Sequence, residues 1–177
     1  TLPGGMPSYG TKLMGVSGHV NKPNTYELEL GIPLRMLVEK HCGGMRNGKK
    51  FKGAIAGGVS MGILGTDQFD APMDYDIGRD YQVLGLGTAC PTVFDEDTDM
   101  VAVARNIARF FKNESCGQCT PCRVGCEKAV KLMEQDKWDQ DLLEDLSQAM
   151  VDASICGLGQ AAPNPIRLTM KHFPEEV

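Results

Sequence analysis

The sequence predicts an α+β fold in which a small, strand-rich domain is followed by a helical domain. Residues up to about Phe94 are rich in glycine and contain short apolar runs, as short strands and turns do. From Asp95 onward the apolar residues recur every three to four positions, which is typical of helices. Four of the seven cysteines lie between Cys116 and Cys126, so we expect the chemistry in the second domain.

Composition and charge exclude several classes of protein. The 177 residues are 42% hydrophobic and 23% charged, which suits one large or two small globular domains. The net charge of −5 comes without clustered lysine and arginine, so we expect no nucleic-acid partner. No apolar run approaches the ~20 residues of a membrane span, and no signal peptide opens the sequence. We therefore predict a cytoplasmic protein without direct membrane insertion, and the odd, crowded cysteines favour a metal site over disulfides.

The first domain should open with a β-hairpin and a short helix. Residues 12–18 alternate weakly and residues 26–30 alternate clearly between apolar and polar, with a turn at 21–24 between them. Pro33 then precedes an apolar spacing over residues 34–40 that predicts a helix with proline at its first position. Further strands are predicted at residues 52–58, 83–85 and 92–94.

The second domain should be a compact bundle of four helices. An acidic segment, residues 95–98, precedes a helix over residues 100–112, in which Val103, Ile107, Phe110 and Phe111 are expected on one face. The next helix is predicted to start at Pro121 or Arg123 and to end near residue 135. Two more follow at residues 139–153 and 164–172, and the short connections predict close packing.

Three cysteines with a spacing of three residues indicate an iron–sulfur site. Cys116, Cys119 and Cys122 can each bind one iron of a [4Fe–4S] cluster, because a short curled loop directs successive thiolates inward. Gly117 and the turn at 120–121 allow backbone N–H groups to face the sulfurs. The positive end of the following helix favours the anionic cluster. Such a cluster moves single electrons and implies a donor and an acceptor outside these residues.

The fourth ligand is open between two cysteines. Cys126 completes the spacing of a bacterial ferredoxin, but that motif ends in Cys-Pro, and Glu127 follows here. Cys126 would also lie one turn into a helix, on the face of Cys122. Cys156 precedes the glycine-rich residues 157–159, and such a loop suits a closing ligand better. We therefore favour Cys156 and keep Cys126 as the alternative.

A zinc-stabilised interaction module is the competing interpretation from another class of function. Structural zinc sites usually combine two pairs of cysteine or histidine ligands. Three cysteines plus a single distant one depart from that pattern, and no histidine lies near the motif. The sequence thus favours the iron–sulfur cluster over zinc.

Several other features are interpreted as structural. Cys42 and Cys90 are expected to be small buried hydrophobic residues, and Trp138 a packing anchor of the bundle. The three histidines are scattered and lack spaced partners. The glycine-rich residues 57–62 and 85–88 lack the lysine and serine or threonine of a phosphate loop, so they are predicted to be turns.

The motifs resemble one protein family. Ser-Cys-Gly-x-Cys-Thr-Pro-Cys-Arg-x-Gly at residues 115–125, followed by Ile-Cys-x-Leu-Gly at 155–159, is similar to the NADH-binding flavoprotein subunit of respiratory complex I. Relatives of that subunit are the diaphorase subunits of NAD-reducing hydrogenases and the β subunits of NAD-dependent, molybdenum- or tungsten-containing formate dehydrogenases. Residues 156–165 look most like the formate dehydrogenase branch.

The first domain and the domain limits follow from the same resemblance. Residues 10–13, 17–23 and 57–60 resemble the family's soluble-ligand-binding β-grasp (SLBB) domain, and residues 98–100 the start of its cluster-domain helix. The resemblance implies the following limits: residues 1–11 as a linker from a missing FMN- and NAD-binding domain, residues 12–94 as the β-grasp domain, and residues 95–177 as the [4Fe–4S] domain.

The resemblance also implies a role in electron transfer. NAD(H) exchanges a hydride with FMN, and single electrons pass through the [4Fe–4S] cluster between the flavin and other clusters. Gly157 and Leu158 are then expected to contact FMN. Because the FMN- and NAD-binding domain is missing, residues 1–177 alone should not turn over.

The formate dehydrogenase branch implies particular partners. Formate and NAD⁺ would give CO₂ and NADH, with a molybdopterin or equivalent α subunit and a thioredoxin-like [2Fe–2S] γ subunit in the same complex. The alternatives are a complex I NADH-quinone oxidoreductase and the diaphorase subunit of an NAD-reducing hydrogenase.

Overall fold

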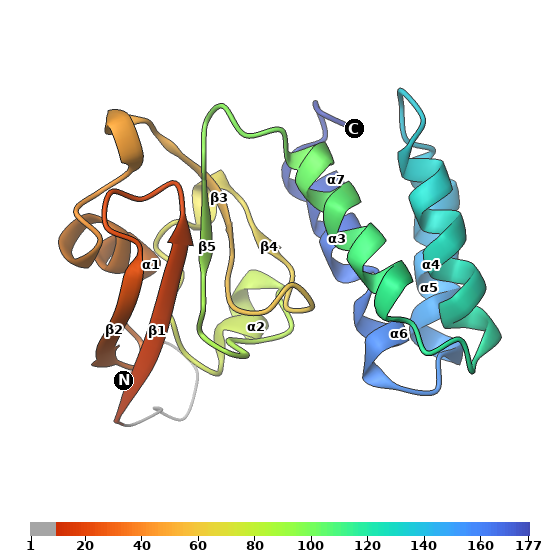
Figure 1. Cartoon of the computed structure of the whole chain (residues 1–177), viewed down its shortest axis with the longest axis horizontal. Coiled ribbons are helices and arrows are strands. Elements are labelled where there is room, and N and C mark those ends of the chain that lie inside the picture. Colours follow the sequence, from red (N-terminus) through yellow and green to blue (C-terminus); the bar gives the residue numbers. More distant parts are fainter. Residues whose placement is uncertain (1–9) are drawn as a thin grey trace. The chain divides into compact units, whose positions relative to one another are not determined.

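The computed structural model describes residues 10–177 (Figure 1), and the chain divides into two compact units, Thr1–Thr98 and Asp99–Val177. Residues 1–9 of the predicted linker lie outside the described residues. The described part of the first unit is built around a five-stranded sheet and that of the second unit around helices, which confirms the α+β class.

The predicted hairpin forms one side of the sheet. Strand β1, Thr11–Gly18, pairs antiparallel with β2, Asn24–Glu29, in a register that places Thr11 opposite Glu29. Met14 and Val16 on β1 are buried, whereas the outer strand β2 buries no residue completely. Of the two strands, β1, with the weaker alternation, is therefore the one that contributes side chains to the core.

The remaining strands complete a mixed sheet of order β2-β1-β5-β3-β4. Strand β5, Thr92–Asp95, lies in the centre, parallel to β1 and antiparallel to β3, Phe51–Ile55. Strand β4, Ile63–Leu64, was not predicted, because two residues are too few to show a period. The parallel pairing of β1 with β5, between the β1–β2 hairpin on one side and the antiparallel strands β3 and β4 on the other, is the strand arrangement expected for a β-grasp domain.

A short helix contributes to the core of the first unit. Helix α1, Leu34–Met36, continues into the single π-helical turn η1, Leu37–His41, and together they cover the predicted helix. Leu34, Leu37 and Val38 are fully buried. Pro33 caps the helix in an extended conformation instead of occupying its first position, which is a small correction.

The strand predicted at residues 83–85 is wrong, because the structure has no strand there among the described residues. This segment instead follows the unpredicted helix α2, Ile77–Tyr81, and packs back onto it. A Cβ added to Gly78 would lie 2.6 Å from the carbonyl oxygen of Val83. This close approach buries Val83, although the residue pairs with no strand. The prediction of a strand was based on its apolar character, which reflects this packing instead.

Short 3₁₀ turns complete the described part of the first unit: η2, Arg46–Gly48, and η3, Thr66–Gln68. The glycine-rich residues 57–62 form turns, as predicted. Gly57 is required there, since a Cβ would lie 2.0 Å from the carbonyl oxygen of Leu86. This close backbone approach explains the glycine without any phosphate ligand.

The second unit contains the predicted helices and one more. These are α3, Met100–Glu114; α4, Thr120–Met133; α5, Gln140–Ala153; the short α6, Gly157–Ala161, which was not predicted; and α7, Asn164–His172. Asp99 and Asp139 cap α3 and α5 by accepting backbone N–H groups, at 2.8 and 3.0 Å. None of the helices in residues 10–177 combines the length and apolar character needed to cross a membrane.

The bundle core is made mostly of small and aliphatic side chains. Trp138 is buried and its indole N–H donates to the carbonyl oxygen of Met133 at 3.1 Å, which confirms its predicted packing role. Phe110 was expected to face the core but is 47% exposed. The buried face of α3 lies one position further along and comprises Met100, Ala104, Ile107, Ala108 and Phe111.

Candidate functional site

The cysteine triplet lies at the start of α4. Cys116 is exposed in the connection from α3, Cys119 is the partly exposed N-cap residue of α4, and Cys122 is buried in its first turn. Cys156 is exposed and is the N-cap residue of α6. Three of these four thiols therefore lie at or before the N-terminus of a helix, where the helix dipole stabilises a thiolate.

Local sequence explains the shape of the triplet loop. Gly117 has a φ of +76°, which side-chain-bearing residues rarely adopt, so the loop can turn between the first two cysteines. The Arg123 guanidinium donates to the carbonyl oxygen of Gly117 and lies 3.4 Å from the Thr120 hydroxyl. Pro121 occupies the first turn of α4, where its missing N–H costs nothing.

The segment around Cys156 packs directly against this loop. The backbone N–H of Ile155, followed by that of Cys122, lowers the pKa of the Cys119 thiol. Gly159 lies so close to α4 that an added Cβ would be 2.8 Å from the Cβ of Cys122. Residues distant in sequence thus bring Cys156 beside the triplet.

Cys126 has a different environment. It is 2% exposed and lines a small cavity inside the bundle with apolar residues of α3, α5, α7 and the α6–α7 connection, namely Phe111, Met150, Ala162 and Ile166. Burial, followed by the neighbouring Cys122 charge, raises the pKa of the Cys126 thiol to about 12. This thiol faces the core, where a protonated sulfur packs as a small hydrophobic group.

The residues present fit an iron–sulfur cluster. Cys122 has a hydroxyl neighbour, since Ser115 Oγ lies 3.3 Å from its sulfur. Within residues 10–177 no three His, Cys, Asp or Glu side chains converge as ligands of a single metal ion do. A cluster does not need that convergence, because each thiolate binds a different iron. Soft thiolates with backbone N–H donors suit a cluster better than zinc.

The other predicted residues have mixed outcomes. Cys42 is fully buried, as predicted, but Cys90 is exposed, and the prediction of burial was wrong. Cys90 lies in the irregular segment before β5, which has no helical or strand period to indicate its direction. Gly157 is exposed with open space around it, and Leu158 is half-buried, so both are accessible beside Cys156.

Sequence reasoning missed a polar cluster in the first unit. Asp95 was placed in a solvated acidic segment, yet it is 3% exposed and lies 3.1 Å from Nδ1 of His19. Thr98 donates a hydrogen bond to Asp95 at 3.1 Å, and Lys49 lies 3.7 Å away. The sequence feature that could have predicted this burial is the position of Asp95 directly after the predicted strand residues Val93 and Phe94.

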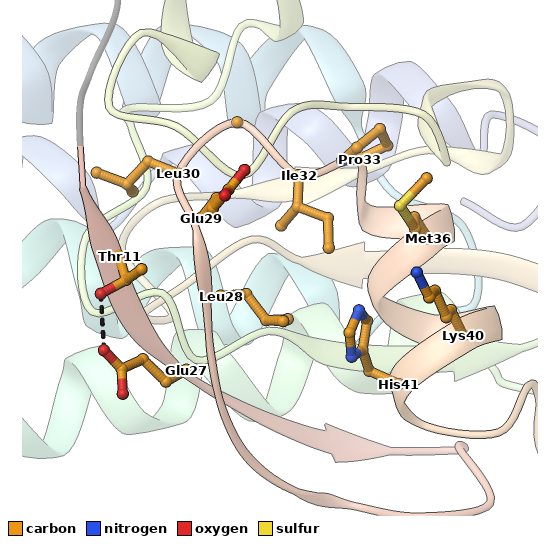
Figure 2. A pocket seen from close by; sticks show the side chains of 11 residues that line it. Thr11, Glu27, Leu28, Glu29, Leu30, Ile32, Pro33, Met36, Lys40 and His41 are labelled. Carbon is orange, nitrogen blue, oxygen red and sulfur yellow. Dashed lines mark hydrogen bonds between the residues drawn. The ribbon is translucent and has the colours of Figure 1, made fainter.

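A groove in the first unit is a second candidate site (Figure 2). It has a volume of about 510 Å³ and lies between β2 and η1, with Leu28, Ile32 and Met36 among its apolar lining. Glu27 hydrogen-bonds to Thr11 at one side, and η1 contributes a lysine and a histidine. Acidic and basic groups are mixed along the groove, and its lining contains no cysteine.

Comparisons with known proteins identify both domains. Residues 102–177 match the family described as the NADH-ubiquinone oxidoreductase-F iron-sulfur binding region, and residues 13–64 match the SLBB domain. NADH dehydrogenase [ubiquinone] flavoprotein 1 of Dictyostelium discoideum is 43% identical over 95% of this chain and 36% of its own length. The mitochondrial NADH-ubiquinone oxidoreductase 51 kDa subunit of Neurospora crassa is 42% identical over 95% of this chain and 36% of its own length.

A solved structure agrees with these matches. A chain of the NAD⁺-reducing [NiFe]-hydrogenase in its H₂-reduced state superposes with a TM-score of 0.82 at 34% identity, covering 97% of this chain and 30% of that chain. This chain therefore spans less than two fifths of the length of the relatives named here.

The fold and the site define an SLBB domain followed by an iron–sulfur-binding helical domain. Over 95% of its length the chain is homologous to the C-terminal region of the 51 kDa flavoprotein subunit of NADH-quinone oxidoreductase. The match confirms the resemblance to the complex I flavoprotein subunit and the expectation of a [4Fe–4S] cluster, whereas the formate dehydrogenase branch stays a prediction.

Proposed function

We propose that this chain is the electron-relay part of the flavoprotein subunit of an NAD-dependent oxidoreductase, with a [4Fe–4S] cluster on Cys116, Cys119, Cys122 and Cys156. The observation that carries the proposal is the packing of the Cys156 segment onto the triplet loop. The Ile155 backbone N–H lowers the pKa of the Cys119 thiol, and Gly159 lets the start of α6 approach Cys122 closely. The domain limits 12–94 and 95–177 belong to the same proposal.

The chain's own residues hold the cluster and set its environment. When bound, a [4Fe–4S] cluster accepts and releases single electrons. The backbone N–H of Ile155 and the hydroxyl of Ser115 lie beside ligand sulfurs, where hydrogen bonds stabilise negative charge. The packed helices behind the loops keep the four thiolates in place, so little rearrangement accompanies the change of charge.

The flavin and the nicotinamide belong to the proposal for the whole protein. FMN would exchange a hydride with NAD(H), and electrons would pass between FMN and other clusters by way of this one. Gly157 and Leu158 are proposed to contact FMN, since they are accessible next to Cys156. The start of α6 can approach a flat ring because Gly157 has no side chain.

Formate is the first physiological electron donor that we propose, because residues 156–165 resemble the formate dehydrogenase β subunit. The partners would be a molybdopterin or equivalent α subunit and a thioredoxin-like [2Fe–2S] γ subunit. The identity of 43% to a flavoprotein of a ubiquinone-linked NADH dehydrogenase favours complex I as the second candidate, and the hydrogenase superposition favours a diaphorase. A cytoplasmic location stays a prediction, and some relatives are mitochondrial.

The test is to purify the complete oxidoreductase that contains this chain and to assay iron, acid-labile sulfide and zinc. We expect four irons and four sulfides assigned to this chain and an EPR signal on reduction with NADH. A colourless protein with stoichiometric zinc at these cysteines would overturn the relay. NAD⁺ reduction with formate, NAD⁺ reduction with H₂, and NADH oxidation by a quinone then separate the three candidate donors and acceptors.

A further inference from the structure

Ser154 carries a buried hydroxyl beside the cysteine site. The residue is 5% exposed, and its Oγ has no hydrogen-bond partner within the described part of the chain. Its backbone is satisfied, because its N–H donates to Met150 O at 3.1 Å and its carbonyl oxygen accepts from Gln160 Nε2 at 3.0 Å. Both bonds fix the residue at the end of α5, so the hydroxyl is held in place without an acceptor.

The surroundings of this hydroxyl point to the cysteine ligands. A Cβ placed on Gly159 would lie 2.4 Å from Ser154 Oγ and 2.8 Å from the Cβ of Cys122. The Ser154 hydroxyl and Cys122 therefore both lie on the face of Gly159 that a side chain would occupy, close to each other.

An unpaired buried hydroxyl costs free energy unless an acceptor completes it. The ligand side chain of Cys122 is the neighbour of this hydroxyl at Gly159, and its anionic sulfur, or a cluster sulfide bound beside it, can accept a hydrogen bond. Ser115 gives a precedent on the same ligand, since its Oγ lies 3.3 Å from the Cys122 sulfur. A thiolate or a cluster sulfide accepts such bonds readily, because hydrogen bonds to charged groups are stronger than neutral ones.

We propose that the Ser154 hydroxyl donates a hydrogen bond to a sulfur of the [4Fe–4S] cluster on the Cys122 side and thereby raises its reduction potential. The inference rests on the proposed cluster and deepens it. The reduced cluster carries one more negative charge than the oxidised one, so a donor at its sulfur stabilises the reduced form more. Ser154 is a positioning and tuning residue, and it binds no iron.

The test uses the complete oxidoreductase with Ser154→Ala. The equilibrium constant for one-electron reduction of this cluster should fall about tenfold, which is about 59 mV in an EPR-monitored titration. ENDOR of the reduced cluster, compared in H₂O and D₂O, should lose one exchangeable proton coupling. Ser154→Thr, which keeps the hydroxyl, should retain both the potential and the coupling. Ser147→Ala removes another buried serine of α5 and should change neither.

Ser154→Gly provides a second removal of the hydroxyl if the alanine variant binds less iron. An unchanged potential and an unchanged ENDOR spectrum in the variant that keeps its iron would overturn the hydrogen bond. An equal fall of the cluster's reduction potential in Ser154→Ala and Ser154→Thr would also overturn the hydrogen bond, because a change in packing would then be the cause. Wild-type protein without iron would instead overturn the proposed function itself.

Discussion

At the scale of single residues, burial separates two cysteines that the sequence left as alternatives. Cys126 continues the spacing of the triplet, but the helical period turns its thiol to the apolar interior of the bundle. Cys156 lies far away in sequence, yet it is exposed beside the triplet loop. Spacing alone favours Cys126, whereas the direction of the side chain and its accessibility favour Cys156.

Alanine substitution of the two cysteines should therefore have opposite effects on iron content. We expect Cys156→Ala to lose the cluster and to destabilise the helical unit, because metal binding is coupled to folding. Cys126→Ala should keep its iron and lose only about 1 kcal/mol of unfolding free energy, since it removes one buried sulfur. Iron and sulfide analysis with thermal unfolding measures both. Cluster loss in Cys126→Ala alone would reverse the ligand assignment.

Two glycines of α6 offer a matched pair. In Gly159→Ala the new Cβ would lie within 2.8 Å of atoms of both Ser154 and Cys122, so the Cys156 segment must move away from α4. We expect a loss of about 1–3 kcal/mol in unfolding free energy, together with reduced iron content. Gly157→Ala meets no heavy atom within 4 Å and should keep its iron. Equal iron content in both variants would show that cluster binding does not require the close approach of Gly159 to Cys122.

At the scale of elements, the hydrophobic period of the sequence predicted those helices and strands that are long enough to show one. The helix predicted at residues 164–172 has those bounds in α7, and the hairpin of β1 and β2 follows its alternation. Strand β4, with two residues, and α6, with five, are too short to show a repeat. The apolar pair Val83 and Leu84 was interpreted as a strand, but tertiary packing and not a strand ladder buries Val83, and Leu84 is 59% exposed.

The sequence predicts the thiolate ligands of the proposed site, but it does not predict the groups that surround them. Thiolate spacing and the glycine after Cys156 are local features of the sequence. Whether Ser154 is buried beside Cys122 depends on a close contact between α4 and the start of α6, which no local pattern encodes. The same holds for Asp95, which local charge places in solvent and the sheet places in a buried cluster.

The carboxylate of Asp95, at the end of β5, should make the stability of the first unit depend on acidic pH. Burial alone would raise the pKa of Asp95, but the Thr98 hydroxyl, His19 and Lys49 outweigh it and lower the pKa below its ordinary 3.8. A carboxylate with a lowered pKa contributes stability above pH 3.8, and this contribution is lost as the pH falls through the lowered value. We expect Asp95→Asn to be less stable than wild type at pH 7 by about 1–3 kcal/mol.

The difference between the two proteins should shrink as the pH falls below 3.8, which denaturant unfolding at several pH values would measure. Asp97→Asn is the matched control, because Asp97 is 65% exposed and pairs with Lys49 at the surface. Such a pair contributes about 0–1 kcal/mol, so this variant should stay close to wild type. A difference for Asp95→Asn that is independent of pH would show that the carboxylate charge is not the cause.

At the scale of the whole molecule, the chain has two units with separate cores. The helical core contains residues of α3, α4, α5 and α7 together with Trp138, and the sheet buries its own set around Met14 and Val93. The four proposed ligands all belong to the helical unit. The energy of cluster binding should therefore act on one unit, although both belong to one polypeptide.

Removing iron should consequently affect the two units unequally. We expect chelation under reducing conditions to speed amide hydrogen exchange in residues 99–177, with the largest change at the triplet loop and residues 154–161, because the thiolates lose the ions that connect these segments. Exchange in β1, β3 and β5 should stay unchanged, since the described sheet holds none of the proposed ligands. Mass spectrometry of the complete protein before and after chelation measures this, with Asp95→Asn as the control that alters the sheet instead. Equal acceleration in both units would mean that the cluster stabilises the chain as one cooperative structure.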